Sequence, residues 1–228
     1  MGTGRAGVVV NFEMKQGSGM AKDQANNGAA IMEERLFTSA HAALTFAFNY
    51  SAQAVERPMM ARMADKGGGS GKGLGGLDGA GQAGMILSKV TSLSRLHQAI
   101  LWARFGERVA NCPCCGSPAD DHDWLAAIRV ISDHAVADAL SSHVTSRILR
   151  DAIIARYFGK KLLLQDAASR ANVSTNTATK HNGLLVTWLR GSRTTKEADG
   201  QRGAGKKGEE ARAMEAIAAL FSECGLTG

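Results

Sequence analysis

The sequence contains little that would build a β-sheet protein. Aromatic residues make up 5% of the 228 positions and proline occurs 3 times, and alternation of valine, isoleucine, threonine or tyrosine with polar residues is almost absent. Because such alternation is typical of strands, its scarcity argues against a fold based on sheets. Apolar residues still form 44% of a chain that is long enough to bury a core, so we predict a mostly α-helical protein.

Long apolar runs are missing too. None approaches the roughly 20 residues of a membrane-spanning helix. The N-terminus also lacks the consecutive charged, apolar and small-residue parts of a signal peptide. We therefore expect a cytoplasmic protein that does not contact membranes, in which the thiols stay reduced.

Recognisable catalytic motifs are absent as well. The chain has no Ser-His-Asp order and no His-Glu-x-x-His pair. The glycine-rich stretch Lys66–Gly84 suggests a phosphate loop, but a P-loop would need glycine in place of Lys66 and serine or threonine in place of Gly73. We interpret the stretch as a flexible loop and the protein as a non-enzyme.

Changes of composition along the chain divide it into regions. We predict a disordered tail, an N-terminal helix region, the glycine-rich flexible loop, a helical region with a cysteine knuckle, a helix-turn-helix, and a basic linker with a C-terminal helix. In this order the regions cover residues 1–31, 32–65, 66–84, 85–145, 146–190 and 191–228.

The segment from Arg150 to Lys180 is the most informative part of the chain. Its first, apolar run stops at Gly159 and predicts a support helix. Ala168 has no bulk, so another helix can cross close to it, and Asn172 tolerates the left-handed conformation that a tight turn needs. These features predict a helix-turn-helix behind a support helix.

The second helix of this motif should begin after Ser174, a good N-cap, and run to about Trp188. Helical spacing directs Ala178, Leu184, Leu185 and Trp188 toward the interior. The outer face of the helix and the neighbouring cations are the candidate DNA contacts: Ser174, Thr175, Asn176, Thr179, Lys180, Arg170, Lys160 and Lys161.

This segment resembles the fourth region of bacterial primary-type sigma factors and the phage regulators that share its layout. In that family a helix ending in Arg-Tyr-Phe-Gly, here Arg156–Gly159, precedes a helix-turn-helix of the type Ala-Ala-x-x-x-x-Val-Ser-x-x-Thr, here Ala167–Thr177. His181 and Asn182 depart from the family, in which an apolar and a basic residue are usual. The resemblance covers roughly Ser146–Arg190 and implies a helix-turn-helix that binds double-stranded DNA.

The charge of the chain favours a polyanionic partner. The formal net charge is +6. Between Arg147 and Lys207 basic residues outnumber the acidic ones, which are Asp151, Asp166, Glu197 and Asp199. Cations gathered around a helix-turn-helix are what phosphate contacts require.

A cysteine-rich stretch, Asn111–Pro118, precedes the helix-turn-helix. Cys112 and Cys115 frame a Cys-Pro-x-Cys-Gly turn, which is typical of zinc knuckles. A second Cys-x-x-Cys is missing, so the site needs other ligands. We predict a zinc site formed by Cys112, Cys114, Cys115 and His122, with His134, His143 and Cys224 as the other candidates. A reduced surface loop without metal is the alternative.

A sigma-like helix-turn-helix, a cysteine knuckle and a basic surface in one chain resemble phage late-gene transcription antitermination factors. This resemblance implies a regulator that engages promoter DNA and RNA polymerase. One alternative is a conventional helix-turn-helix activator or repressor. Another is a helical interaction protein whose basic face binds an acidic protein.

Overall fold

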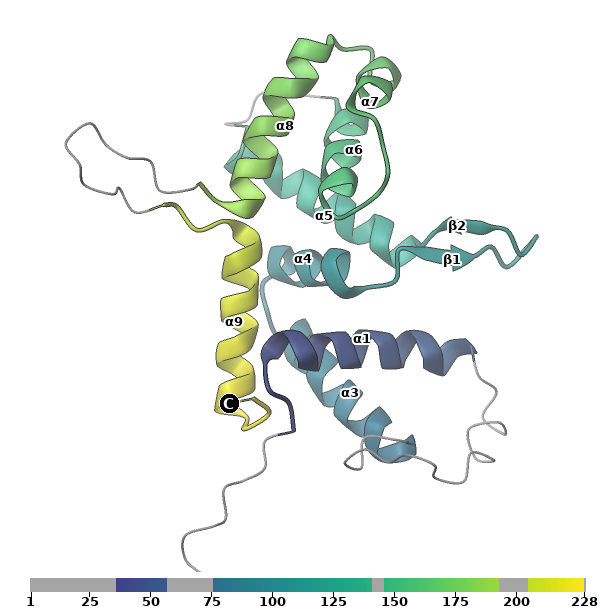
Figure 1. Cartoon of the computed structure of the whole chain (residues 1–228), viewed down its shortest axis with the longest axis vertical. Coiled ribbons are helices and arrows are strands. Elements are labelled where there is room, and N and C mark those ends of the chain that lie inside the picture. Colours follow the sequence, from purple (N-terminus) through teal and green to yellow (C-terminus); the bar gives the residue numbers. More distant parts are fainter. Residues whose placement is uncertain (1–35, 57–75, 141–145, 193–204, 228) are drawn as a thin grey trace, which may run out of the picture. The chain divides into compact units, whose positions relative to one another are not determined.

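The structure is a computed structural model that describes residues 36–56, 76–140, 146–192 and 205–227 (Figure 1). All of them belong to one compact unit, Arg35–Gly228. The helices are α1 (Ala40–Glu56), α3 (Gly76–Thr91), α4 (Arg95–Phe105), α5 (His122–Asp138), α6 (Arg147–Tyr157), α7 (Leu164–Arg170), α8 (Thr175–Arg190) and α9 (Glu209–Glu223). A single hairpin, β1 (Val109–Asn111) and β2 (Pro118–Asp120), completes the described elements. The predicted mostly α-helical fold is thereby confirmed.

Two predictions about less regular segments have different outcomes. The disordered tail proposed for residues 1–31 lies outside the described ranges. The flexible loop proposed for residues 66–84 is wrong from Gly76 onward, because α3 begins there. In α3, Ala83, Ile86 and Val90 are buried, and the helix packs against α1. Burying that apolar face stabilises the helix by more than its glycines cost, at about 1 kcal/mol each.

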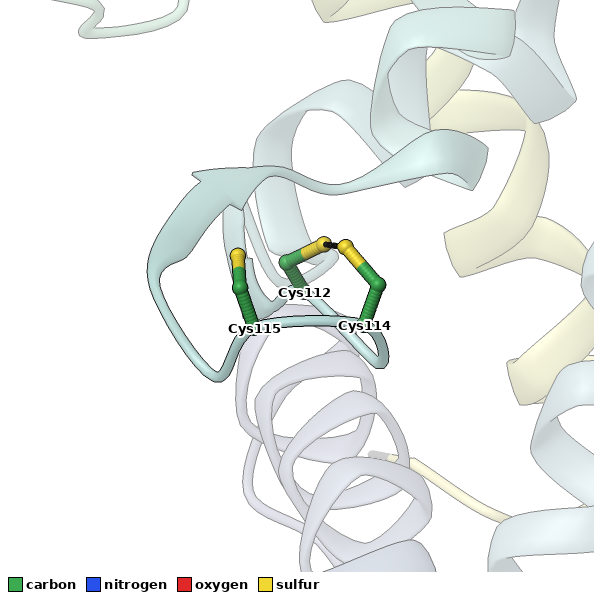
Figure 2. Close-up of side chains that lie close together, drawn as sticks. All are labelled: Cys112, Cys114 and Cys115. Atoms are coloured by element: carbon green, nitrogen blue, oxygen red, sulfur yellow. Dashed lines mark hydrogen bonds between the residues drawn. The ribbon is translucent and has the colours of Figure 1, made fainter.

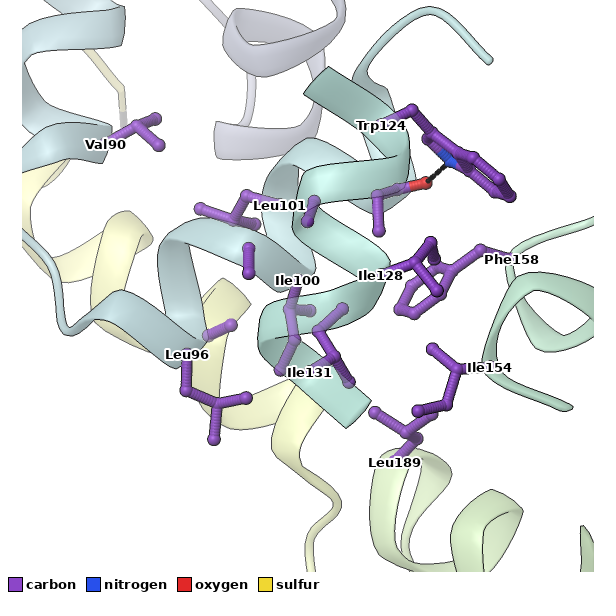
Figure 3. Close-up of a cluster of buried hydrophobic side chains, with 14 of the residues drawn as sticks. Val90, Leu96, Ile100, Leu101, Trp124, Ile128, Ile131, Ile154, Phe158 and Leu189 are labelled. Carbon is purple, nitrogen blue, oxygen red and sulfur yellow. Dashed lines mark hydrogen bonds between the residues drawn. The ribbon is translucent and has the colours of Figure 1, made fainter. Parts of the chain in front are cut away.

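The centre of the core lies where α4 crosses α5 (Figure 3). Ile100 of α4 and Ile131 of α5 are completely buried, and Trp124 is 1% exposed. The indole N–H of Trp124 donates a hydrogen bond of 3.1 Å to the carbonyl of Ala103, so the one polar atom of this ring is satisfied. A large aromatic residue is thus anchored at the point where the two helices meet.

The helix-turn-helix is part of the same core. Ile154 of α6 and Leu189 of α8 are fully buried and belong to one cluster with the residues of α4 and α5 (Figure 3). The region 146–190 therefore shares its interior with the elements that precede it.

The C-terminal helix predicted within residues 191–228 is α9, which folds back on the core. Ala213, Ile217 and Phe221 of α9 are fully buried, and α9 packs against α1, α3, α4 and α8. Beyond it, the carbonyl of Leu226 accepts a hydrogen bond of 3.2 Å from the N–H of Phe37. Within the described ranges, no helix has the length and apolar character needed to cross a bilayer.

Candidate nucleic-acid interface and cysteine cluster

The turn between α7 and α8 has the geometry that its sequence predicts. Asn172 has a φ of 53°, in the left-handed region. The N–H of Asn172 donates to the carbonyl of Ser169 at 3.1 Å, and that of Val173 donates to the carbonyl of Ala168 at 3.0 Å. These bonds satisfy the end of α7 and set the direction in which α8 starts.

The start of α8 is capped as predicted. The side chain of Ser174 accepts a hydrogen bond of 3.2 Å from the N–H of Thr177. In the first turns of α8, Ala178 is fully buried. The predicted contact residues Thr175, Asn176, Thr179 and Lys180 are all exposed. The structure therefore brings these side chains together on one solvent-facing side of the helix.

The inner face of α8 differs from the prediction at one residue. Leu184 is 51% exposed, so its assignment to the interior is wrong. The buried stripe consists of Ala178, Leu185 and Leu189, and Trp188 is half-buried beside it. Because each residue turns a helix by about 100°, the residue before Leu185 points away from that stripe.

The predicted cations near α8 are not equivalent. Lys161, Arg170 and Lys180 are exposed and form no ion pair with any residue that the structure describes. The ammonium group of Lys160 instead forms a salt bridge with Asp120 of β2, which neutralises its charge and ties the hairpin to the segment after α6. Lys160 is therefore the weakest candidate of the four for a phosphate contact.

The cysteines occupy the tip of the β1–β2 hairpin, which the sequence did not reveal as strands. β1 and β2 pair antiparallel with Asn111 opposite Pro118. Across the tip, the N–H of Cys112 donates to the carbonyl of Ser117, and the N–H of Gly116 donates to the carbonyl of Cys112, both at 2.8 Å. Gly116 has a φ of 71°, which a residue with a side chain rarely adopts.

Three thiols converge at this tip. The sulfur atoms of Cys112, Cys114 and Cys115 all lie within 4.8 Å of one another, so the three cysteines can bind a metal ion. Figure 2 shows the sulfur atoms of Cys112 and Cys114 turned toward each other, 2.8 Å apart. In a tetrahedral zinc site, with bonds of about 2.3 Å, sulfur atoms lie about 3.8 Å apart, so the sulfur atoms of Cys112 and Cys114 would have to separate by about 1 Å to bind one ion.

His122 does not join the cluster, and its predicted role as a ligand is not supported. It is the first residue of α5, its side chain is 90% exposed, and its Nδ1 lies 3.3 Å from the carboxylate of Asp123. Within the described part of the chain, no other cysteine, histidine or carboxylate completes the group of three thiols, and the candidate ligand His143 lies outside that part.

Hydrogen bonds shift the pKa values of the three thiols in different directions. The hydroxyl and then the N–H of Ser117 lower the pKa of Cys115 to about 7. The pKa of Cys112 is also lowered, first by the side chain of Cys114, and the pKa of Cys114 is raised by the same contact. Two of the three cysteines are thus biased toward the thiolate, the form that binds metal ions.

Two residues of these sites had no predicted role. Ser117 acidifies Cys115, and its position two residues after that cysteine was the available signal. Asp120 pairs with Lys160 across a long stretch of chain, and no local pattern indicates such a pair.

No family model, curated protein or solved structure matches this chain.

Proposed function

We propose that the protein binds double-stranded DNA through the first turns of α8 and acts as a transcription regulator. The observation that carries the proposal is the exposed face formed by Thr175, Asn176, Thr179 and Lys180, on a helix whose start is fixed by a cap and a tight turn. An α-helix fits the major groove of DNA, where its N-terminal residues reach the base edges.

The side chains on this face have suitable chemistry. The amide of Asn176 can form two hydrogen bonds with an adenine. The hydroxyl of Thr179 donates to the carbonyl of Thr175 at 2.9 Å, which leaves its methyl group available to a thymine methyl. Lys180, Lys161 and Arg170 supply the positive charge that phosphate groups need.

A binding-site selection with the full chain, followed by shift assays at several salt concentrations, tests the proposal. Asn176→Ala should relax the preference for one base pair at a cost of about 1–3 kcal/mol. Lys180→Ala should weaken binding to all DNA sequences alike. It should also reduce the slope of log affinity against log salt concentration by about 1. Arg95→Ala, at the exposed start of α4, is the control for loss of charge. Equal binding by wild type and both α8 variants would remove α8 from the DNA.

The finer form of the proposal is a phage-type late-gene antitermination factor that engages promoter DNA and RNA polymerase. It is supported by the resemblance of residues 146–190 and by the hairpin, where Val109 and two of the three thiols are exposed. A conventional activator or repressor needs only its DNA-binding face. Readthrough of a terminator, measured on templates with and without the selected site, distinguishes an antitermination factor from such a regulator.

The hairpin holds a zinc ion in this proposal. Cys112, Cys114 and Cys115 supply three thiolates, and a ligand from solvent or from a partner supplies the fourth. Elemental analysis of protein purified without chelators should find about one zinc per chain. Cys115→Ser should lose it, whereas Cys224→Ser, which changes an exposed cysteine outside the cluster, should keep it. Metal-free wild-type protein would exclude the site.

A further inference from the structure

A groove of about 320 Å³ lies between α5, α6 and the segment around α7. Its lining includes Ala152 and Ala155 of α6 and Ala167 of α7. Because alanine has almost no side chain, these facing positions leave space that larger residues would fill in a closed core. Ile148, 57% exposed, lies along the same groove. The groove thus offers apolar surface to a ligand.

Positive charge borders this apolar surface. Arg129 and Arg170 both line the groove, are exposed, and pair with no acidic group that the structure describes. The one carboxylate in the lining, Asp151, has its Oδ1 buried without a hydrogen-bond partner among the described residues. Its other carboxylate oxygen, Oδ2, lies 3.8 Å from Nε of Arg147, so the negative charge of Asp151 is already paired and does not offset the two arginines.

The groove is a different surface from the part of the proposed DNA face that lies on α8. No residue of α8 lines the groove. Of the residues assigned to DNA, Arg170 and Lys160 also border it, and the Lys160 ammonium is engaged by Asp120. A ligand in the groove would therefore leave Asn176 and Lys180 free.

We propose that this groove binds an acidic amphipathic helix of a partner protein. Apolar side chains on one face of such a helix would enter the alanine-lined floor, as in other helix-in-groove complexes. Carboxylates flanking that face would pair with Arg129 and Arg170. Nucleic acid fits less well, because the lining contains no aromatic side chain on which a base could stack. The inference stands on the groove alone and does not require that α8 binds DNA.

The test uses the full-length protein and a fluorescent helical peptide that carries leucine on one face and glutamate on both flanks. Binding is followed by fluorescence anisotropy. Ala152→Leu, which fills the floor, and Arg129→Glu, which reverses the rim charge, should each weaken binding by tenfold or more, about 1.4 kcal/mol. Arg95→Glu makes the same charge change outside the groove and should have no effect. A peptide with lysine in place of glutamate should not bind.

Several outcomes would overturn the proposal. One is that the wild type binds no peptide at the highest soluble protein concentration. Another is that Ala152→Leu and Arg129→Glu bind as the wild type does. A third is that Lys180→Ala weakens peptide binding as strongly as Arg129→Glu does, which would place the peptide on α8. Circular dichroism shows whether each variant is folded, and shift assays on the same variants report DNA binding separately.

Discussion

Asn172 determines, as a single residue, how α7 is joined to α8. Its φ of 53° is the only positive value at a residue other than glycine in the described chain. Replacing it with alanine should cost about 1–2 kcal/mol, because a Cβ without a local polar group is disfavoured in the left-handed region. Asn172→Gly should cost little. Urea denaturation measures the free energy of unfolding of both variants, with Asn49→Ala, at an exposed position of α1, as the control. If Asn172→Ala costs no more than the control, the turn does not depend on this residue.

Cys115 should react at neutral pH. Since hydrogen bonds from Ser117 lower its pKa to about 7, its thiolate should be half-populated near that pH and dominant above it. In metal-free protein, alkylation of Cys115 followed by mass spectrometry should therefore rise through pH 7 and then level off. Ser117→Ala should move the midpoint to higher pH. A midpoint that stays unchanged in this variant would mean that Ser117 is not the cause.

At the residue scale, predictions succeeded where the cause is local. The cap at Ser174 and the turn at Asn172 depend on a few neighbouring residues, and both were correctly predicted. Leu184 was placed wrongly because two adjacent leucines fit one stripe almost equally, and packing decides between them. His122 is near the cysteines in sequence, but α5 carries it away from the cluster.

The junction of α8 with α9 depends on two glycines for different reasons. Gly191 has a φ of 92°, and it pairs with Lys207 in an isolated antiparallel bridge. Gly208 has an ordinary φ of −81°, but a Cβ there would collide with the backbone of Leu189, Arg190 and Gly191. The close approach of two backbones therefore excludes any side chain at Gly208.

This contact predicts opposite effects for two glycine substitutions. Gly208→Ala should reduce the free energy of unfolding by at least about 2 kcal/mol, because backbone atoms cannot move aside cheaply. Gly183→Ala, inside α8 with open space around it, should increase that energy by about 0.5–1 kcal/mol. Urea denaturation of both variants measures the difference. Equal effects of the two substitutions would contradict the close contact.

Among the elements, the helices with regular apolar spacing could be predicted and two others could not. The spacing of apolar residues predicted the support helix and the second helix of the helix-turn-helix, and α6 and α8 end within a few residues of the predicted positions. The start of α3 was hidden by its glycines, since packing on α1 decides it. The β1–β2 hairpin has strands of three residues with mostly exposed side chains, and they are too short for an alternating pattern to reveal them.

At the scale of the whole molecule, the helix-turn-helix is not an independent module. One buried cluster joins α4 to the helices that follow it. It contains Trp124 and Ile131 of α5, Ile154 of α6 and Leu189 of α8. A fragment that starts near Asp123 would expose the face of α5 that α4 covers. The motif pattern marked residues 146–190 as a segment but carried no information about this shared interior. Function is therefore best tested with substitutions in the full chain.

The cysteine hairpin offers the test that distinguishes an antitermination factor from a repressor. A repressor acts by occupying its site, so the exposed face of α8 is sufficient for it. An antitermination factor must also contact RNA polymerase, and the hairpin extends from the junction of α4 and α5, away from α8 (Figure 1).

Cys112→Ser in the full chain should therefore lower terminator readthrough by about tenfold, the equivalent of about 1.4 kcal/mol of polymerase affinity, because it removes one of the three thiols proposed to bind zinc at the hairpin tip. Binding to the selected DNA site should change less than about twofold, since the hairpin contributes nothing to the buried core. Cys224→Ser, which alters an exposed cysteine just after α9, is the matched control and should leave both activities intact. If RNA polymerase reads through terminators as well with the Cys112→Ser variant as with the wild type, the hairpin has no part in antitermination. A conventional activator or repressor then becomes the better description.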